Sequence, residues 1–423
     1  MQDTIAVEDL KIGMFIHLEG GWMSHPFPLS SFRIGTQDEI HRIRELGSRR
    51  LRWSREKSVI VESSNPDAAS AVAAIDATLD ANAAKDPKAL RRALLDAQRK
   101  AARLCESQFN ESATALKQTM ADVRDRPDAA SAASHALATT LQEKMLGEEQ
   151  MCVRVLSARA GEKPMAHALN VTVIAMLMGR LFKLPEHEMV ELGVGAMLHD
   201  IGKLELPQHV HDHDERLSAA ELKAYCDHVG LGVQLGRRMK LSPAVLQVIE
   251  QHHEEADGSG FPQRLNMDRM SDAARIVSLV NRYDSLCNPR ASSRALTPHE
   301  ALSRLFVQGR GKFDTTMLNA FIRMMGVYPA GSVVQLTDER FAVITQVNAS
   351  RPLKPQVLVY DSAVPRDEAL LLNLLNETDL GIRRSLNAAQ LPQVARNYLE
   401  PAPRLAYFFE PAAVAAEQGA ECP

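Results

Sequence analysis

Three polar residues follow an apolar helical segment and carry side chains suited to metal and phosphate chemistry. His199 and Asp200 come directly after this segment, and Lys203 lies three residues further on. A neutral imidazole beside a carboxylate can bind a divalent transition metal, and the compact ammonium of a lysine can bind a phosphate. An ordinary polar helix end would look the same, so the metal hypothesis depends on the rest of the chain.

Four further histidines lie near the end, or on one face, of other predicted helices. His167 precedes His199 by 32 residues, His228 follows it after 29, and His252–His253 begin 24 residues later. These lengths suit successive antiparallel helices whose ends meet around one pocket. Five histidines and one aspartate are more than one ion needs, whereas two ions that share the aspartate would use them all. Two ions roughly 3.5–4 Å apart can clamp a hydroxide that attacks phosphorus.

Amphipathic helices are the elements that must position these side chains. Apolar residues recur with helical periodicity between residues 163 and 330, and Ser218 with Glu221 forms a capping box. Glycine and proline mark a loop directly after the paired histidines. The expected elements are helices at Ala166–Leu181 and Glu186–Leu198, a helix from Ser218 that carries His228, a helix at Pro243–His253, the loop Asp257–Pro262 and a helix at Ala273–Leu286.

The chain as a whole predicts a mainly α protein made of five successive regions. Composition and periodicity change at each proposed boundary. The regions are a small α+β N-terminal domain (1–63), a helical spacer (64–160), the helical domain with the histidines (161–328), a small antiparallel β extension (329–400) and a partly disordered tail (401–423). The spacer is either an inert connection or a coiled dimerisation stalk, for which its heptads are irregular.

Alternating patterns place strands in the two flanking regions. In the N-terminal domain, strands are expected around a helix at Asp38–Leu46, and in the β extension three strand candidates are separated by turns. The N-terminal candidates are Met14–Leu18, Leu51–Trp53 and Val59–Val61, and the C-terminal ones are Val333–Leu336, Phe341–Ile344 and Val357–Tyr360.

Composition argues against several classes of protein. The formal net charge of −4 gives no basis for binding a nucleic-acid polymer or an anionic membrane surface. The five cysteines are scattered without a Cys-x-x-Cys pair, as in proteins with free thiols in a reducing compartment. The polar first residues do not resemble a signal peptide, and the apolar runs are too short to span a bilayer. These features predict a cytoplasmic protein.

The ordered motifs between His167 and Asp284 resemble the HD-GYP family, a branch of the HD metal-dependent phosphohydrolases that degrades cyclic di-GMP. Residues 5–62 also resemble the small uncharacterised domain often found ahead of HD-GYP modules, notably at Gly13–Met14 and from Trp22 to Ile34. The central domain is therefore expected to have a helical HD-type fold. The matching positions are His167–Val171, His199–Lys203 with Pro207, Leu217–Ser218 and Glu221 leading to His228, Gly232, His252–Glu254, Asp257–Pro262, Ala274–Ile276 and Tyr283–Asp284.

The resemblance implies a phosphodiesterase with two divalent metal ions, iron or manganese by family habit. Asp200 would bridge the ions, and the hydroxide between them would open cyclic di-GMP to linear pGpG, with a further step to GMP less expected. The ligands of the first ion would be His167, His199 and Asp200, and those of the second Asp200, His228, His252 and His253. Asn281 stands where the family has an aspartate as a further ligand of the first ion, and a neutral amide binds more weakly.

The resemblance also implies which residues contact the substrate. Lys203 would bind the scissile phosphate and stabilise the charge of the transition state, acting with Asp200 as a catalytic residue. The loop after the paired histidines would line the pocket, with Phe261 near a guanine, and Arg290 would contact the dinucleotide. The loop residues expected at the substrate are Gly258, Gly260, Phe261 and Pro262.

Other departures from the family pattern shape these expectations. Phe261 replaces the tyrosine of the name-giving motif, and Lys163 replaces a glutamate seen in members with a third metal. Of the usual Arg-Pro-Tyr-Arg run, this chain keeps Arg290 and, less clearly, Arg294. Two ions are therefore expected, in a pocket with a reduced arginine content.

Several polar residues near the motifs have ordinary explanations as well as functional ones. The cluster from His209 to Asp214 is expected to be a solvated loop, although it could contact substrate near the pocket mouth. Glu254 is expected to orient His253 rather than bind metal. Asp284 is expected to be structural.

Asn281 and the reduced arginine run also motivate a different hypothesis. A receptor or interaction module could bind the dinucleotide or a signalling protein without turnover, and metal content would distinguish it from the enzyme. A third hypothesis is a phosphohydrolase for another nucleotide, such as a mixed cyclic dinucleotide. The sequence leaves open the metal, the signal sensed by the N-terminal domain, homodimer formation and the pathway controlled.

Overall fold

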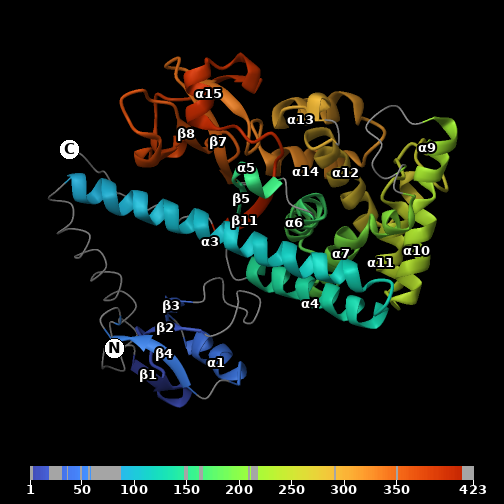
Figure 1. Ribbon diagram of the computed structural model, residues 1–423, viewed down its shortest axis with the longest axis horizontal. Helices are drawn as coiled ribbons and strands as arrows, with labels where there is room; N and C mark the ends of the chain where they lie inside the picture. Colours follow the sequence, from blue (N-terminus) through green and yellow to red (C-terminus); the bar gives the residue numbers. More distant parts are fainter. Residues whose placement is uncertain are drawn as a thin grey trace. The chain divides into compact units, whose positions relative to one another are not determined.

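The computed structural model divides the chain into two compact units, Met1–Lys100 and Ala101–Pro423 (Figure 1). The described residues are 3–18, 31–35, 37–47, 50–55, 58, 87–146, 151–161, 165–207, 210, 218–289, 292–348 and 351–411. Within these ranges the chain is mainly helical, with antiparallel sheets in the N- and C-terminal regions. The predicted fold class is therefore confirmed.

The described part of the first unit contains a small antiparallel sheet, a helix packed on it and the first part of α3 (Pro87–Asp122). The strands lie in the order β1-β4-β2-β3, and α1 (Gln37–Glu45) packs its apolar face into a core that includes Ile16, Ile40, Ile43 and Leu51. The predicted strand at Val59–Val61 lies outside the described residues. The strands are β1 (Asp3–Ala6), β2 (Phe15–His17), β3 (Ser31–Arg33) and β4 (Arg50–Ser54).

The second unit is built around α6, a helix that is buried over most of its length. α7 and α12 pack along α6, α11 packs between α7 and α12, and α10 packs on α11. None of the described helices is long and apolar enough to cross a membrane. The helices are α3 (Pro87–Asp122), α4 (Pro127–Leu146), α5 (Ala158–Gly161), α6 (Ala166–Leu181), α7 (Glu186–Leu198), α9 (Ala219–Cys226), α10 (His228–Arg238), α11 (Pro243–Gln251), α12 (Asp272–Cys287), α13 (Pro298–Gln308), α14 (Thr315–Met325) and α15 (Gln393–Leu399).

A second antiparallel sheet covers one side of this helical region. Its described strands run in the order β10-β6-β7-β5-β11, and β8 pairs with β7 and β9. α15 packs against β7 over a core that includes Val343, Leu386 and Leu399. The strands are β5 (Met151–Val155), β6 (Val333–Leu336), β7 (Phe341–Asn348), β8 (Gln356–Val359), β9 (Leu371–Asn373), β10 (Ile382–Leu386) and β11 (Tyr407–Pro411).

The sheet draws strands from two segments where the sequence predicted none. β5 lies in the segment expected to be a helical spacer, and β11 lies in the segment expected to be a tail. Each is a five-residue segment, too short to show a clear period without its partner. The two strands pair with each other over their full length, so only tertiary pairing reveals them.

Helix α4 and the part of α3 that begins at Ala101 come from the predicted spacer and belong to the second unit. α4 packs on α7, and Phe109, Leu116 and Leu141 on α3 and α4 are fully buried or nearly so. A buried apolar face of this kind contributes to the stability of the unit that it packs on.

Candidate metal centre

His199 and Asp200 lie where α7 ends and a short 3-10 turn, η4 (Ile201–Glu205), begins. α7 is buried from Leu192 to Leu198, so its packing fixes the position of the two polar residues that follow. His199 is fully buried, whereas 18% of the Asp200 side chain is exposed. The packing of the apolar helix thus fixes the position of a pair of candidate ligands.

Glycine allows η4 to pack directly on α10. A Cβ added at Gly202 would lie 1.9 Å from the carbonyl oxygen of His228 and 2.4 Å from the amide nitrogen of Gly232. Real Cβ atoms do not approach backbone so closely, so a larger residue would separate the two elements. The glycine after the His-Asp pair therefore sets the distance between Asp200 and His228.

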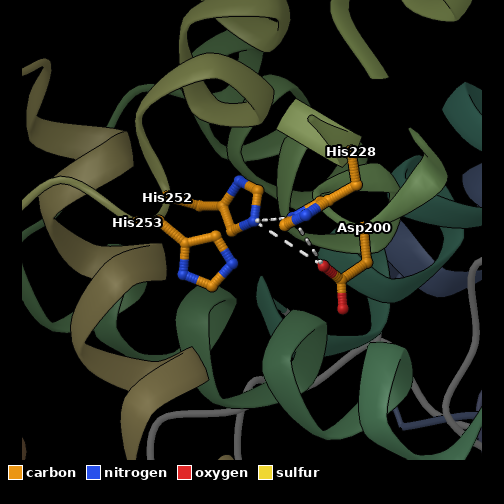
Figure 2. A group of neighbouring side chains, drawn as sticks. All are labelled: Asp200, His228, His252 and His253. Carbon is orange, nitrogen blue, oxygen red and sulfur yellow. Dashed lines mark hydrogen bonds and ion pairs between the residues drawn. The ribbon is translucent and has the colours of Figure 1, made fainter. Parts of the chain in front are cut away.

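Asp200, His228, His252 and His253 form one group of candidate ligands, with one atom of each within 4.8 Å of the others. Asp200 Oδ1 lies 3.5 Å from His228 Nε2 and 3.6 Å from His252 Nε2. The two nitrogens are 3.3 Å apart. Figure 2 shows these side chains converging from η4, the start of α10 and the end of α11. We call this group the second half-site.

His167, His199 and Asp200 form another group of candidate ligands, again with one atom of each within 4.8 Å of the others. We call this group the first half-site. Asp200 Oδ2 lies 3.6 Å from His167 Nε2 and 3.4 Å from His199 Nε2. Each oxygen of one carboxylate therefore faces a different set of imidazoles. That arrangement is suited to a carboxylate shared by two ions.

Backbone carbonyls orient three of the imidazoles. The Nδ1 atoms of His199, His228 and His252 lie 2.7, 2.5 and 2.8 Å from the carbonyl oxygens three residues earlier in the chain. A ring that donates from Nδ1 to a carbonyl presents the lone pair of Nε2. In all three rings Nε2 is the atom that faces Asp200.

The unpaired atoms of the centre fit divalent metal ions. Among the described residues, His199 Nε2, Asp200 Oδ1 and His253 Nε2 are buried without a hydrogen-bond partner. A buried polar atom without a partner costs free energy, which coordination of a cation would offset. Imidazole nitrogen with carboxylate oxygen suits iron, manganese or zinc.

The electrostatics of the two half-sites differ. Burial lowers the pKa of His228 to about 4 and also lowers the pKa of His252. Burial lowers the pKa of His167 too, but hydrogen bonds with Asp200 and Asp284 outweigh it and raise that pKa to about 9. Before a metal binds, the second half-site therefore holds neutral imidazoles, whereas His167 holds a proton.

Lys203 closes one side of the centre. Its Nζ lies 2.5 Å from Asp200 Oδ2 and 5.2 Å from the centre of the Tyr225 ring. Burial raises the pKa of Asp200, but the charges of Lys203 and His199 outweigh it and hold that pKa well below its usual range. Asp200 is therefore an anion at neutral pH, as a shared ligand must be.

The loop after the paired histidines folds back onto His253. Phe261 stacks on the His253 ring at 4.5 Å between ring centres, and its amide donates to the His253 carbonyl at 3.1 Å. A Cβ at Gly260 would lie 2.4–2.6 Å from the backbone of residues 253–255, so glycine permits this approach. Gly258 has a positive φ of 77°, which also favours glycine.

The Glu254 side chain binds the backbone of this loop. Its carboxylate accepts hydrogen bonds from the amides of Gln263 and Leu265 at 2.6 and 2.8 Å, and its side chain is fully buried. The expectation that Glu254 orients His253 is therefore replaced by a role in anchoring the loop. Two backbone amides satisfy a buried carboxylate well.

A cavity of about 330 Å³ adjoins the second half-site. Gly260 and Phe261 line it on the loop side, and Asn281 lies in its wall. The Asn281 side chain is largely buried, and its Oδ1 accepts a 3.3 Å hydrogen bond from Ser285. The cations Arg282 and Lys312 also line this cavity.

Some predicted site residues lie outside the part of the chain that the structure describes. They are Arg290, Lys163, His209 and the segment from His211 to Asp214. The capping box at Ser218 and Glu221 is present, but α9 ends at Cys226. His228 begins the next helix, α10, so the expected single helix is in fact two.

Asp284 and Asn170 form hydrogen bonds beside His167 that the sequence did not predict. Asp284 Oδ2 lies 2.6 Å from His167 Nδ1, and Asn170 donates to the other carboxylate oxygen at 2.7 Å. Asp284 was expected to be structural, yet it orients a candidate ligand. The signal available was the helical spacing of Asn170, one turn after His167, which places both on one face.

The helical domain, with a His-Asp pair at a helix end and histidines from neighbouring helices around it, defines an HD-type protein with a candidate metal site. Residues 134–317 match the HD domain, and residues 2–133 match a domain of unknown function, DUF3391. The chain thus combines a DUF3391 domain with an HD domain. This result confirms the resemblance that the motifs predicted.

Known proteins with similar sequences are named phosphodiesterases. The chain is 28% identical to the cyclic di-GMP phosphodiesterase PA4108 of Pseudomonas aeruginosa, over 86% of each chain. It is 23% identical to the cyclic di-GMP phosphodiesterase PdeB of Borreliella burgdorferi, over 55% of this chain and 62% of that protein. It is 27% identical to the 3′3′-cGAMP-specific phosphodiesterase 2 of Vibrio cholerae, over 37% and 30%.

Proposed function

We propose that this protein is a metal-dependent phosphodiesterase that hydrolyses cyclic di-GMP to linear pGpG. The observation that carries the proposal is the Asp200 carboxylate, whose two oxygens face two separate groups of histidines. A carboxylate shared in this way can hold two ions close together, as two-metal hydrolysis of phosphoesters needs. The HD domain and the two relatives named cyclic di-GMP phosphodiesterases support the same conclusion.

The histidines and Asp200 of the centre would bind the metal ions, and Lys203 would stabilise charge on the substrate. His167, His199 and Asp200 would hold one ion, and Asp200, His228, His252 and His253 the other. When bound, the ions supply a water of lowered pKa and neutralise charge on the phosphate. Lys203, which Asp200 holds beside the centre, would donate a hydrogen bond to an oxygen of the scissile phosphate as charge develops there.

The adjoining cavity would bind the rest of the dinucleotide. Phe261 offers an aromatic face on which a guanine can stack. Arg282 lines the same cavity, and its charge would attract the second phosphate, whereas Lys312 in that cavity is paired with Glu255 at 2.5 Å. These groups suit a ligand that carries both bases and phosphates.

The test is turnover of cyclic di-GMP by protein purified without oxygen, with metal content measured on the same sample. We expect about two ions per chain and linear pGpG as the product, separated from GMP by chromatography. His199→Ala should lose the activity, and His187→Ala, an exposed histidine on α7, should retain it. If the metal-loaded protein left cyclic di-GMP uncleaved and His199→Ala behaved identically, the proposal would be lost.

A mixed cyclic dinucleotide is the second candidate substrate. The similarity to a 3′3′-cGAMP-specific phosphodiesterase motivates it, and an adenine can stack on Phe261 as well as a guanine can. Competition between the two dinucleotides decides between them. We expect the lower KM and the higher kcat/KM for cyclic di-GMP.

A further inference from the structure

A chain of hydrogen bonds connects the first half-site to the C-terminal strand. It begins at His167, whose Nδ1 lies 2.6 Å from the fully buried carboxylate of Asp284. Asn170 on α6 and Asn288 at the end of α12 both donate to the other oxygen of Asp284, at 2.7 and 2.9 Å. Both oxygens of Asp284 are thus held, and the carboxylate has one orientation.

The same two asparagines bind the backbone just before β11. Both amide groups donate to the carbonyl oxygen of Leu405, at 2.9 and 3.0 Å. In return, the Leu405 amide donates to Asn288 at 2.7 Å, and the Tyr407 amide donates to Asn170 at 2.8 Å. Each asparagine therefore contacts both the C-terminal backbone and Asp284, so the position of that backbone constrains the orientation of the Asp284 carboxylate.

The C-terminal segment is itself held firmly at this place. Ala406 and Tyr407 are fully buried, and β11 pairs with β5 along its whole length. A nearly buried ion pair between Arg154 and Glu410, at 2.6 Å, joins the same two strands. The backbone that contacts the asparagines is therefore a fixed support.

We propose that Leu405–Tyr407 is a positioning element of the metal centre, which acts through Asn170, Asn288 and Asp284 to orient His167. The inference rests on the proposed metal centre and extends it to the C-terminal sheet. Outer groups that orient a metal-binding histidine typically contribute about 10- to 100-fold to metal affinity. The first half-site should depend on this support, whereas the second, oriented by local carbonyls, should not.

Asn288→Ala in the full chain is the test, because it removes contacts with Asp284 and Leu405 without changing a ligand. We expect one of the two ions to bind about 10- to 100-fold more weakly to Asn288→Ala, with the other unchanged. Manganese titration by calorimetry measures both affinities. Excess manganese should restore a large part of the lost turnover, which would not occur if the variant were merely misfolded.

Asn397→Ala is the matched control, because it removes an exposed asparagine on α15 whose hydrogen-bond partner is Gln393 of the same helix. It should leave both manganese affinities unchanged. Equal weakening of metal binding in Asn397→Ala, or two unaltered affinities in Asn288→Ala, would overturn the inference.

A second variant keeps the test decisive if Asn288→Ala folds poorly. Asp284→Asn preserves the shape of the side chain and removes its charge, so it should weaken the same ion. Adding Asn288→Ala to Asp284→Asn should have little further effect, because both act through one chain of contacts. Fully additive losses would contradict the inference. A shifted affinity without any cyclic di-GMP turnover in the wild type would remove the proposed substrate and leave the positioning role intact.

Discussion

The two half-sites share Asp200 and differ in how their histidines are held. In the second half-site, His228 and His252 are each oriented by a carbonyl three residues earlier in the chain. In the first, His199 is oriented in the same way, but His167 depends on Asp284, which lies 117 residues away. Local contacts form wherever the helix end forms. The contact of His167 forms only when α6 and α12 pack together, so we expect the first half-site to be the more sensitive to distant change.

The largest effect should follow from a change in the ligand that the half-sites share. Asp200→Asn keeps the size of the side chain and removes its charge, so both ions should bind more weakly and turnover should fall by more than about 100-fold. Elemental analysis and turnover measure the two effects. Asp268→Asn, at an exposed aspartate, is the control and should match the wild type. Loss of only one ion in Asp200→Asn would show that the carboxylate is not shared.

The next effect tests the packing that brings the half-sites together. Gly202→Ala would place a Cβ against the backbone of His228, so η4 must move away from α10. We expect a loss of roughly 3 kcal/mol in the free energy of unfolding, and weaker binding at the second half-site. Urea unfolding measures the first. Gly230→Ala in α10 is the matched control, because nothing lies near its Cβ position, and it should be neutral or stabilising. Equal stability of the two variants would refute the close-packing argument.

The release of protons on metal binding should distinguish the two half-sites in the wild-type protein. The pKa of His167 is raised to about 9 in the metal-free protein, whereas that of His228 is lowered to about 4. At pH 7, filling the first half-site must therefore displace a proton, and filling the second must not. Below pH 9, affinity at the first half-site should rise about tenfold per pH unit, and above pH 9 it should level off.

Calorimetry in buffers of different ionisation enthalpy measures this release directly. We expect about one proton per ion at the first half-site at pH 7. His167→Gln should abolish the release. Equal proton release at both half-sites would mean that the metal-free centre does not hold its proton on His167.

The smallest effect should be confined to the second half-site and its pocket. Phe261→Ala removes the ring that stacks on His253 and lines the cavity. KM should rise about two- to tenfold, with both ions retained. Phe306→Ala, at a ring that is 44% exposed on α13, should leave KM unchanged. A loss of metal in Phe261→Ala would instead show that the stacking supports His253 as a ligand.

Local chemistry in the sequence was enough to predict much of this arrangement. The apolar period of α6 and α7, the capping box at Ser218 and the spacing of the histidines indicated a helical domain with ligands at helix ends. The carbonyl contacts of His199, His228 and His252 are local as well, since each follows from a helix or turn at that place. The division of α9 from α10 was missed because the two helices follow each other without a breaking residue.

Only the tertiary structure decided which polar residues support the centre. Asp284 and Glu254 are both buried acids near a histidine in the motifs, yet one orients His167 and the other anchors a loop. β5 and β11 lie in segments that predicted a spacer and a tail, and become strands by pairing with each other. The physical reason is common to all of these cases. A buried carboxylate or a short strand takes its role from partners far away in the chain, and the sequence around it does not contain them.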